Sequence, residues 1–379
     1  MKPLKISKTL SLPLDVVTQT LAAVARKGAG KTYFATLLAE LMRRASAQVI
    51  AIDIVGNWYG LRLGPGGRGK GVDIYVFGGE HGDLPLTPDA GPRIARLLVE
   101  RPISAVLDIS AFRKAERLRF AAQFAEEFFH LKKTQRSPVH VFVEEAQKLI
   151  PQVVRGESAA MVGAWEDIVR LGRNYGIGCT LVTQRPQSVN KEVLSQVECL
   201  VALQVNGVHE RKALEEWVQE KGADRALVGE LPGLAVGEAY VWSPSWLRIF
   251  ERVKIATKGT YDASATPEVG KRRRTVKLSH ADVAALKAEL AEVVTRAEQD
   301  DPSALKRRIA ELERALAQKL PAKPVVHLRE PKTIKVETLV LREREAKRLE
   351  KVVARASKIV EQAHAVADSV AELVAASVE

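Results

Sequence analysis

Cysteine is scarce in this sequence: only Cys179 and Cys199 occur among 379 residues. Both lie in apolar runs typical of buried strands, so we expect small buried hydrophobes in a reducing cytoplasm and no disulfide framework. The spacing of Cys, His and acidic residues does not suggest a metal site. No apolar run reaches about 18 residues, and the N-terminal MKPLKISKTL lacks a secretory apolar segment. We therefore expect a soluble, cytoplasmic protein without a membrane partner.

Aromatic residues are also few, at 5% of the chain, whereas apolar residues make up 46%. The core must therefore be largely aliphatic, and the length allows one large domain with an appendage or two domains. Basic residues outnumber acidic ones, giving a net charge of +12. Such a charge favours a polyanionic partner, with nucleic acid the leading candidate, although it can also serve solubility alone.

The most informative segment is TLAAVARKGAGKT, at residues 20–32. A short apolar run enters a small-residue loop, and a helix-like stretch follows at 33–44. This order predicts a phosphate-binding P-loop, in which backbone amides and the helix N-terminus surround an anion. Lys31 would reach the β- and γ-phosphates of ATP, and the Thr32 hydroxyl would bind Mg²⁺. The expected ATP contacts are Lys27, Gly28, Ala29, Gly30, Lys31, Thr32 and Tyr33. A chance glycine-rich turn is the alternative.

One residue departs from the P-loop pattern. The first loop position usually holds glycine, and here it is Ala25. A methyl group is tolerable there if the backbone φ is negative and damaging if φ is positive. We expect the substitution Ala25→Gly to be neutral or activating.

A second chemical signal lies at residues 139–145, VHVFVEE. A continuous apolar strand that ends in acids is the Walker B pattern. Glu144 would hold Mg²⁺ through water, and Glu145 would act as the general base that orients the attacking water. The alternative is a pair of solvated carboxylates in a turn, which a preceding P-loop makes less favoured.

Apolar strand-like runs alternate with helical stretches over residues 1–257. This alternation predicts an α/β fold with a mostly parallel sheet and helices on both faces. Asp53 ends one such strand, at the edge where open sheets bind ligands. Gln184 ends another, where its amide could sense the γ-phosphate or simply cap the strand.

The composition changes after residue 257. Residues 258–278 predict a linker with a basic run at 271–274, which is either a phosphate-contacting patch or a solvated tether. Residues 279–379 predict a helical region, with apolar residues at a/d spacing in 302–320 that indicate a short coiled coil. It carries no catalytic group, so we expect it to serve oligomerisation or partner binding.

Together, the motifs VARKGAGKTY, VFVEEAQ and LGRNYGIGCTLVTQRPQ resemble the HerA/FtsK superfamily of P-loop ATPases, and the likeness spans roughly residues 18–257. The resemblance implies a RecA-like fold and a ring, usually a hexamer, that translocates duplex DNA using ATP and Mg²⁺. It makes Gln184 the sensor and Arg173 the arginine finger that enters a neighbour's site, with Arg170 as runner-up. Asp53 matches an acidic position of HerA-like proteins.

Three departures limit what the resemblance implies. These are Ala25, the small number of residues before the P-loop, which leaves no room for the N-terminal barrel of archaeal HerA, and the lack of FtsK's DNA-reading domain. Two hypotheses follow. The first is an ATP-driven DNA translocase or helicase-like motor. The second is a nucleotide-gated oligomeric scaffold whose helical tail recruits an effector such as a nuclease. A packaging or conjugation pump with the same core is a weaker third reading.

Overall fold

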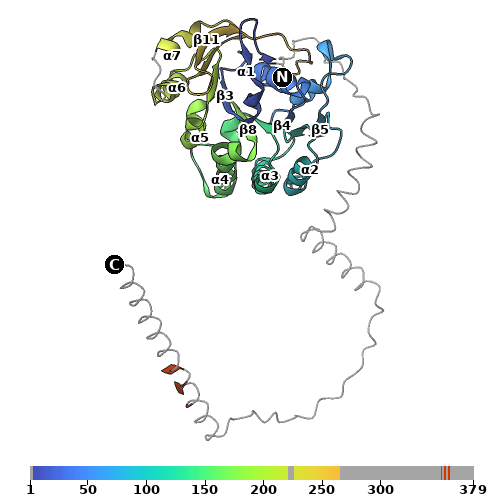
Figure 1. The fold of residues 1–379 in the computed structure, drawn as a ribbon, viewed down its shortest axis with the longest axis vertical. Coiled ribbons are helices and arrows are strands. Elements are labelled where there is room, and N and C mark those ends of the chain that lie inside the picture. Colours follow the sequence, from blue (N-terminus) through green and yellow to red (C-terminus); the bar gives the residue numbers. More distant parts are fainter. Residues whose placement is uncertain (1–2, 221–225, 265–350, 352–353, 356, 359–379) are drawn as a thin grey trace, which may run out of the picture. The chain divides into compact units, whose positions relative to one another are not determined.

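A computed structural model describes residues 3–220 and 226–264, together with five residues further along the chain (Figure 1). The five are Lys351, Ala354, Arg355, Ser357 and Lys358, and all of them are helical and exposed. The basic run at 271–274 and the a/d pattern at 302–320 lie outside the described residues. The helical tail and its coiled coil therefore stay predictions.

One large sheet forms the centre of the domain. Its strands are β3 (Thr20–Val24), β4 (Gln48–Asp53), β5 (Tyr75–Gly78), β6 (Ala105–Asp108), β7 (Val139–Glu144), β8 (Ile177–Thr183), β9 (Cys199–Ala202), β10 (Glu238–Ser243) and β11 (Ile249–Lys254). They are ordered β11-β10-β9-β3-β8-β7-β4-β6-β5. Strands from β9 to β5 are parallel, and β10 pairs antiparallel with both neighbours. The predicted mostly parallel α/β sheet is confirmed.

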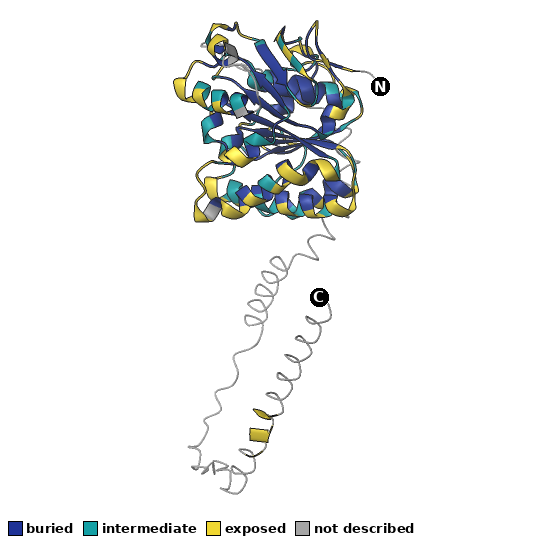
Figure 2. Ribbon diagram, turned by 60° about the vertical axis from the view of Figure 1, so that its left-hand side comes forward, coloured by how far each residue is buried: buried dark blue, intermediate teal, exposed yellow. Residues whose placement is uncertain are grey.

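Helices cover the sheet on its two faces (Figures 1 and 2). They are α1 (Lys31–Arg44), α2 (Gly91–Glu100), α3 (Lys114–Thr134), α4 (Gly156–Leu171), α5 (Lys191–Ser195), α6 (Val208–Glu220) and α7 (Ala226–Glu230). Helices α2, α3 and α4 pack side by side and bury their apolar residues in one core cluster. Helix α1 lies in the other cluster, with the small hairpin of β1 (Leu4–Lys5) and β2 (Ser11–Leu12).

The sequence pattern explains these two cores. The central strands are buried along their whole length, which requires the continuous apolar runs seen in β3, β7 and β8. On α3, Phe120, Phe124 and Phe128 recur every four residues and stack with ring centroids 6.1 and 5.4 Å apart. All three are buried, as the sequence predicts for one face of that helix.

Strand order brings three loops together at one edge of the sheet. Strand β8 lies between β3 and β7, so Val24 is level with Thr183, and Glu144 is level with Val182. The carboxyl ends of parallel strands share an edge, where open α/β sheets bind ligands. The P-loop, the two acids and Gln184 therefore meet, although up to about 160 residues separate them in the chain.

Packing against the domain continues past the predicted boundary at residue 257. Residues 258–264, assigned to the linker from their composition, contact α1, and Lys258, Thr260 and Ala263 are buried. These contacts were not predicted from the composition because polar residues form them. Both cysteines are buried and free, as predicted. Within the described residues, no helix is long and apolar enough to cross a membrane.

Candidate active site

The loop between β3 and α1 has the geometry of a phosphate cradle. Gly28 and Gly30 adopt φ values of +79° and +105°, which residues with a Cβ rarely adopt. Ala25 is absent from the residues with positive φ, so its methyl group is compatible with the loop. The Ala25 N–H donates to the Thr183 carbonyl at 3.3 Å, and the Arg26 N–H donates to the Gln204 carbonyl at 2.8 Å. These bonds fix the loop to the ends of β8 and β9.

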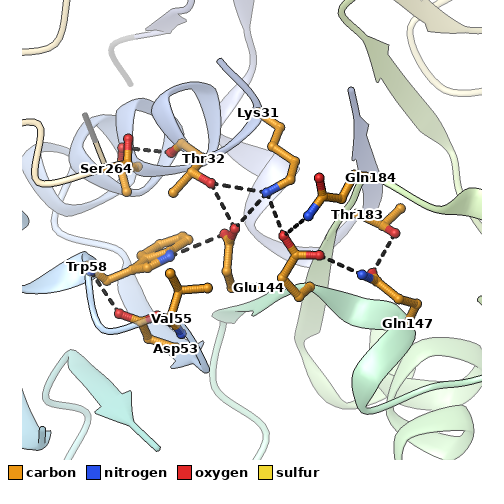
Figure 3. Close-up of polar contacts among 12 residues, drawn as sticks. Lys31, Thr32, Asp53, Val55, Trp58, Glu144, Gln147, Thr183, Gln184 and Ser264 are labelled. Carbon is orange, nitrogen blue, oxygen red and sulfur yellow. Dashed lines mark hydrogen bonds and ion pairs between the residues drawn. The ribbon is translucent and has the colours of Figure 1, made fainter. Parts of the chain in front are cut away.

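Lys31 and Thr32, the first residues of α1, face the acids at the end of β7 (Figure 3). The Lys31 Nζ lies 3.1 Å from Glu144 Oε1 and 3.0 Å from Glu145 Oε1. The Thr32 hydroxyl donates to Glu144 Oε1 at 2.8 Å. Burial lowers the pKa of Lys31, but the two carboxylates outweigh it and leave the pKa above its usual value. Lys31 is therefore a fixed cation.

The donor set around Thr32 and Glu144 fits a magnesium ion. A hydroxyl and a carboxylate oxygen at hydrogen-bond distance are hard ligands, and Mg²⁺ is commonly held by one or two such side chains plus phosphate and water. Among the residues that the structure describes, no group of three or more His, Cys, Asp or Glu is placed so that it could hold a metal ion. An ion here would have to complete its coordination with phosphate oxygens and water.

Glu145 is held by two amides. The Gln184 Nε2 donates to Glu145 Oε1 at 2.7 Å, and the Gln147 Nε2 donates to Oε2 at 2.5 Å. The other end of the Gln147 amide accepts from the Thr183 hydroxyl at 2.7 Å. Glu145 itself has a left-handed backbone, with φ +50°, a conformation that clusters at functional sites. Gln147 was missed from the sequence, although it is a polar residue two positions after Glu145.

A buried indole holds the other acid. Trp58 Nε1 donates to Glu144 Oε2 at 3.3 Å, and the Trp58 ring packs on Phe142 with centroids 5.3 Å apart. Trp58 is fully buried and Glu144 almost so. With Thr32 and Lys31 on Oε1 and Trp58 on Oε2, the Glu144 carboxylate has one fixed orientation. Sequence reasoning did not assign Trp58 a role.

Asp53, predicted from its place at a strand end to bind a ligand, is not among the residues that line the pocket described below. Its carboxylate is fully buried and accepts four backbone N–H bonds, at 2.8–2.9 Å, from residues 55–58. Burial raises the pKa of Asp53 to about 7, and the amide bond from Trp58 opposes this. Because the carboxylate is used by its own loop, Asp53 shapes the segment that carries Trp58.

The P-loop, the two acids and Gln184 line a pocket of about 630 Å³, a usual size for a small-molecule site. Its walls are Lys27, Gly28, Gly30, Lys31, Thr32, Tyr33, Val55, Asn57, Glu144, Glu145, Gln184, Val236, Gly237, Ile255, Asp262 and Ser264. Most of the predicted ATP contacts are thus brought together with both acids and Gln184. Ala29 is fully buried and is not part of this lining.

Arg173 and Arg170 lie at the opposite edge of the sheet. Arg173 is exposed in the turn before β8, whereas Gln184 follows the end of β8. The seven residues of that strand span on the order of 20 Å. Arg170 is paired with Glu166 at 2.7 Å. Neither arginine can serve the pocket of its own chain, so a finger role requires a second copy.

Comparisons with known proteins bear on this geometry. No protein-family model matches the chain. The chain is 34% identical over 109 residues to the probable DNA double-strand break repair helicase HerA of Methanocaldococcus jannaschii. The aligned segment covers 29% of this chain and 21% of the relative. The chain is 31% identical over 117 residues to the HerA helicase of Pyrococcus furiosus, covering 30% and 20%. Over these 109 and 117 residues the chain is similar in sequence to HerA helicases. It spans about a fifth of the length of these curated relatives.

A solved structure shows the same fold. The bacterial conjugative coupling protein TrwBdeltaN70 superposes with a TM-score of 0.50 at 11% identity, covering 69% of this chain and 90% of that one. At this identity the likeness concerns the fold alone. It agrees with the mostly parallel sheet whose strand ends bring the predicted P-loop and the two acids to one edge.

Proposed function

We propose that the HerA-like domain hydrolyses ATP to ADP and phosphate and drives movement along double-stranded DNA. The observation that carries the proposal is the meeting of Lys31, Thr32, Glu144, Glu145 and Gln184 in one pocket. This is the set needed to bind a triphosphate and activate water. The net charge of +12 supports a polyanionic partner. The HerA helicases to which the chain is similar are named for DNA repair.

Each side chain has a role in the proposed reaction. Lys31 binds the β- and γ-phosphates. Thr32 and Glu144 would hold Mg²⁺, and the ion would supply charge neutralisation for the phosphates. Glu145 takes a proton from water as the water oxygen bonds to the γ-phosphorus. The bond to the bridging oxygen of ADP breaks, and ADP leaves with phosphate. Gln184, which now donates to Glu145, orients the water or senses the γ-phosphate.

Among the described residues, the cations that line the pocket are Lys27 and Lys31, and no arginine lines it. An arginine finger would therefore have to come from elsewhere. Arg173 is exposed at the far edge of the sheet, where a neighbouring copy could present it to this pocket. We therefore propose a homo-oligomer, with a hexameric ring as the form that the family resemblance implies. Because each complete active site would lie between two copies, the rate of hydrolysis per chain should depend on protein concentration.

The second candidate is a nucleotide-gated scaffold that recruits an effector, such as a nuclease, through the region after residue 264. Two sequence features supported this candidate. The first, the alanine in the P-loop, no longer does, because Ala25 fits without positive φ. The second is the long C-terminal region itself, of which five residues are described as helical. Cytoplasmic location and effector binding stay predictions.

Phosphate release by the full chain, with and without linear duplex DNA, tests the proposal. We expect turnover that duplex DNA stimulates and that Lys31→Ala abolishes. Glu145→Gln should keep ATP binding and lose roughly 10²–10⁴-fold in rate, the usual share of a general base. Glu126→Gln, an exposed acid on α3, is the matched control and should behave as wild type. Slow turnover that ignores DNA would favour the scaffold, and wild-type protein that does not bind ATP would rule out both.

A further inference from the structure

Residues 256–264, which we call the strap, leave the end of β11 and run against the P-loop helix α1. The buried Glu40 carboxylate, on α1, accepts from the Gly259 N–H at 2.9–3.0 Å and from the Thr260 hydroxyl at 2.9 Å. The buried Lys258 Nζ donates to the Thr36 hydroxyl at 3.0 Å, and its backbone N–H donates to the Tyr33 hydroxyl at 3.0 Å. The strap is thus attached to the helix whose first turn forms the phosphate site.

These contacts fix the strap in one position. Burying Glu40 and Lys258 is costly unless each finds its partners, and each does. Gly259 fits against Glu40 because a Cβ there would come within 2.8 Å of Glu40 Oε1. Further along, the Tyr261 N–H donates to the Leu63 carbonyl at 2.9 Å, and Ala263 is buried. A chain held at both ends in this way presents the residue between them in a defined direction.

The strap delivers Asp262 and Ser264 to the pocket. Both line it, and Figure 3 shows Ser264 on the side of Thr32 that is remote from Gln184. Asp262 Oδ1 accepts from the Ser264 N–H at 3.1 Å and from its hydroxyl at 2.6 Å, and lies 3.5 Å from Lys258 Nζ. The Asp262 side chain is 34% exposed. Among the described residues, no polar contact is made by its Oδ2.

The arrangement of the pocket indicates which part of a nucleotide the Asp262 carboxylate would contact. Lys31 and the two acids mark where the β- and γ-phosphates lie. The rest of the nucleotide must extend along the N-terminus of α1, away from Gln184. Besides the phosphate site, the pocket lining includes the apolar Val236 and Ile255, the aromatic Tyr33 and the carboxylate of Asp262. Apolar surface suits a base, and a carboxylate acceptor suits a sugar hydroxyl.

We propose that Asp262 accepts a hydrogen bond from a ribose hydroxyl of the bound nucleoside triphosphate, so that the strap is a nucleoside-recognition element. The inference rests on the proposed function, because it requires a nucleotide in this pocket. It assigns to the strap the selection of ribonucleotides over deoxyribonucleotides or free polyphosphate. Ser264 acts as a positioning residue, since its hydroxyl and N–H hold Oδ1 and turn the other oxygen to the ligand.

The test measures binding of ATP, 2′-deoxy-ATP, 3′-deoxy-ATP and inorganic tripolyphosphate to the full chain by calorimetry. Asp262→Ala should weaken ATP binding about tenfold or more, the effect of one lost charge-assisted hydrogen bond. Tripolyphosphate binding should stay within about twofold, because the phosphate site is intact. Wild type should bind one of the two deoxy nucleotides as weakly as Asp262→Ala binds ATP. The affinity for that deoxy nucleotide should be the same in wild type and in Asp262→Ala. Glu126→Ala serves as the control.

Several results would overturn the inference. One is ATP binding by Asp262→Ala that equals wild type. Another is an equal loss for ATP and tripolyphosphate, which would mean that the pocket as a whole is disturbed. A third is wild-type protein that binds ATP and both deoxy nucleotides alike. In each case wild type still binds ATP, and the proposed function survives. Failure of wild type to bind either ATP or tripolyphosphate would instead remove the proposed function itself.

Discussion

Trp58 donates its indole N–H to Glu144 at 3.3 Å, across 86 positions of sequence. The bond links the proposed metal ligand to a loop that is itself held by the four amides on Asp53. Second contacts of this kind orient ligands and tune metal affinity, and their loss commonly costs 10–100-fold. The loop after β4 therefore belongs to the candidate active site through Glu144, although Asp53 itself is not part of the pocket lining.

Trp58→Phe tests this relationship, because it keeps an aromatic ring and removes the N–H. We expect the Mg²⁺ concentration for half-maximal ATP binding to rise roughly tenfold, while binding of ATP in EDTA changes little. Calorimetry with and without Mg²⁺ gives both numbers. Trp246→Phe is the control, since its indole donates to Asp15 instead. An unchanged Mg²⁺ requirement would show that the indole bond does not orient Glu144.

Gln147 gives a second prediction. Gln147→Met preserves length and removes the amide that joins Glu145 to Thr183. We expect kcat to fall about tenfold with KM for ATP little changed, since one bond that positions the base is lost. Thr183→Val should act in the same direction, whereas Thr183→Ser keeps the hydroxyl and should keep the rate. Gln135→Met, on the exposed end of α3, is the matched control. A rise in KM alone would assign Gln147 to binding.

The contrast between Glu145 and Gln147 shows what the sequence could predict. The local sequence predicts a strand that ends in two acids, and it predicts a P-loop at GAGKT. Once the sheet is taken as parallel, the two are expected to lie close together at the carboxyl ends of the strands. Gln184 followed for the same reason, from the end of a neighbouring strand. Trp58, Asp262 and Gln147 act through contacts between loops, for which neither periodicity nor spacing gives a signal.

Asp53 and the strap show how composition can mislead. A carboxylate at a strand end can bind a ligand or its own backbone, and only the path of the following loop decides between them. Residues 258–264 were assigned to a linker because they are polar, but Lys258 and Thr260 are polar groups that pair with groups on α1. A buried polar network is indistinguishable from a solvated segment until its partners are known.

Arg173→Ala tests the proposed sharing of sites between copies. ATP binding should be retained, and turnover should fall by roughly 10³-fold or more if the guanidinium enters a neighbour's site. Mixing this variant with Lys31→Ala should restore part of the rate, because some interfaces then combine an intact P-loop with an intact arginine. Arg170→Ala is the comparison, since Arg170 is paired with Glu166. Normal turnover by Arg173→Ala would exclude it as the finger.

Ala25→Gly examines the departure from the P-loop pattern. Because Ala25 does not need positive φ, glycine should add only freedom in the unfolded chain. We expect unfolding free energy to fall by about 0.5–1 kcal/mol. ATP affinity should stay within about twofold, since the amides of the cradle are unchanged. Denaturant titration and calorimetry measure the two quantities. A large loss of ATP affinity would mean that the methyl group itself supports the loop.

The buried His140, the second residue of β7, leads to a prediction for the pH dependence of stability. Its Nδ1 lies 3.0 Å from the Val17 carbonyl, which can only accept, so Nδ1 carries the proton. Its Nε2 therefore accepts from the Thr180 hydroxyl at 2.7 Å. Burial lowers the pKa of His140 from 6.5 to about 4, and the bond to Val17 opposes the shift only in part.

The sign of the effect follows from that shift. The unfolded chain takes up the His140 proton below pH 6.5, whereas the folded chain resists it until about pH 4. The neutral ring therefore contributes to the free energy of unfolding above pH 6.5. This contribution, roughly 3 kcal/mol, is lost as the pH falls from 6.5 through about 4. In His140→Gln, which retains hydrogen-bonding groups and cannot be charged, the free energy of unfolding should decline less steeply between pH 7 and pH 4. Denaturant titrations across this range compare the two slopes, and parallel slopes would show that His140 is not the group that titrates.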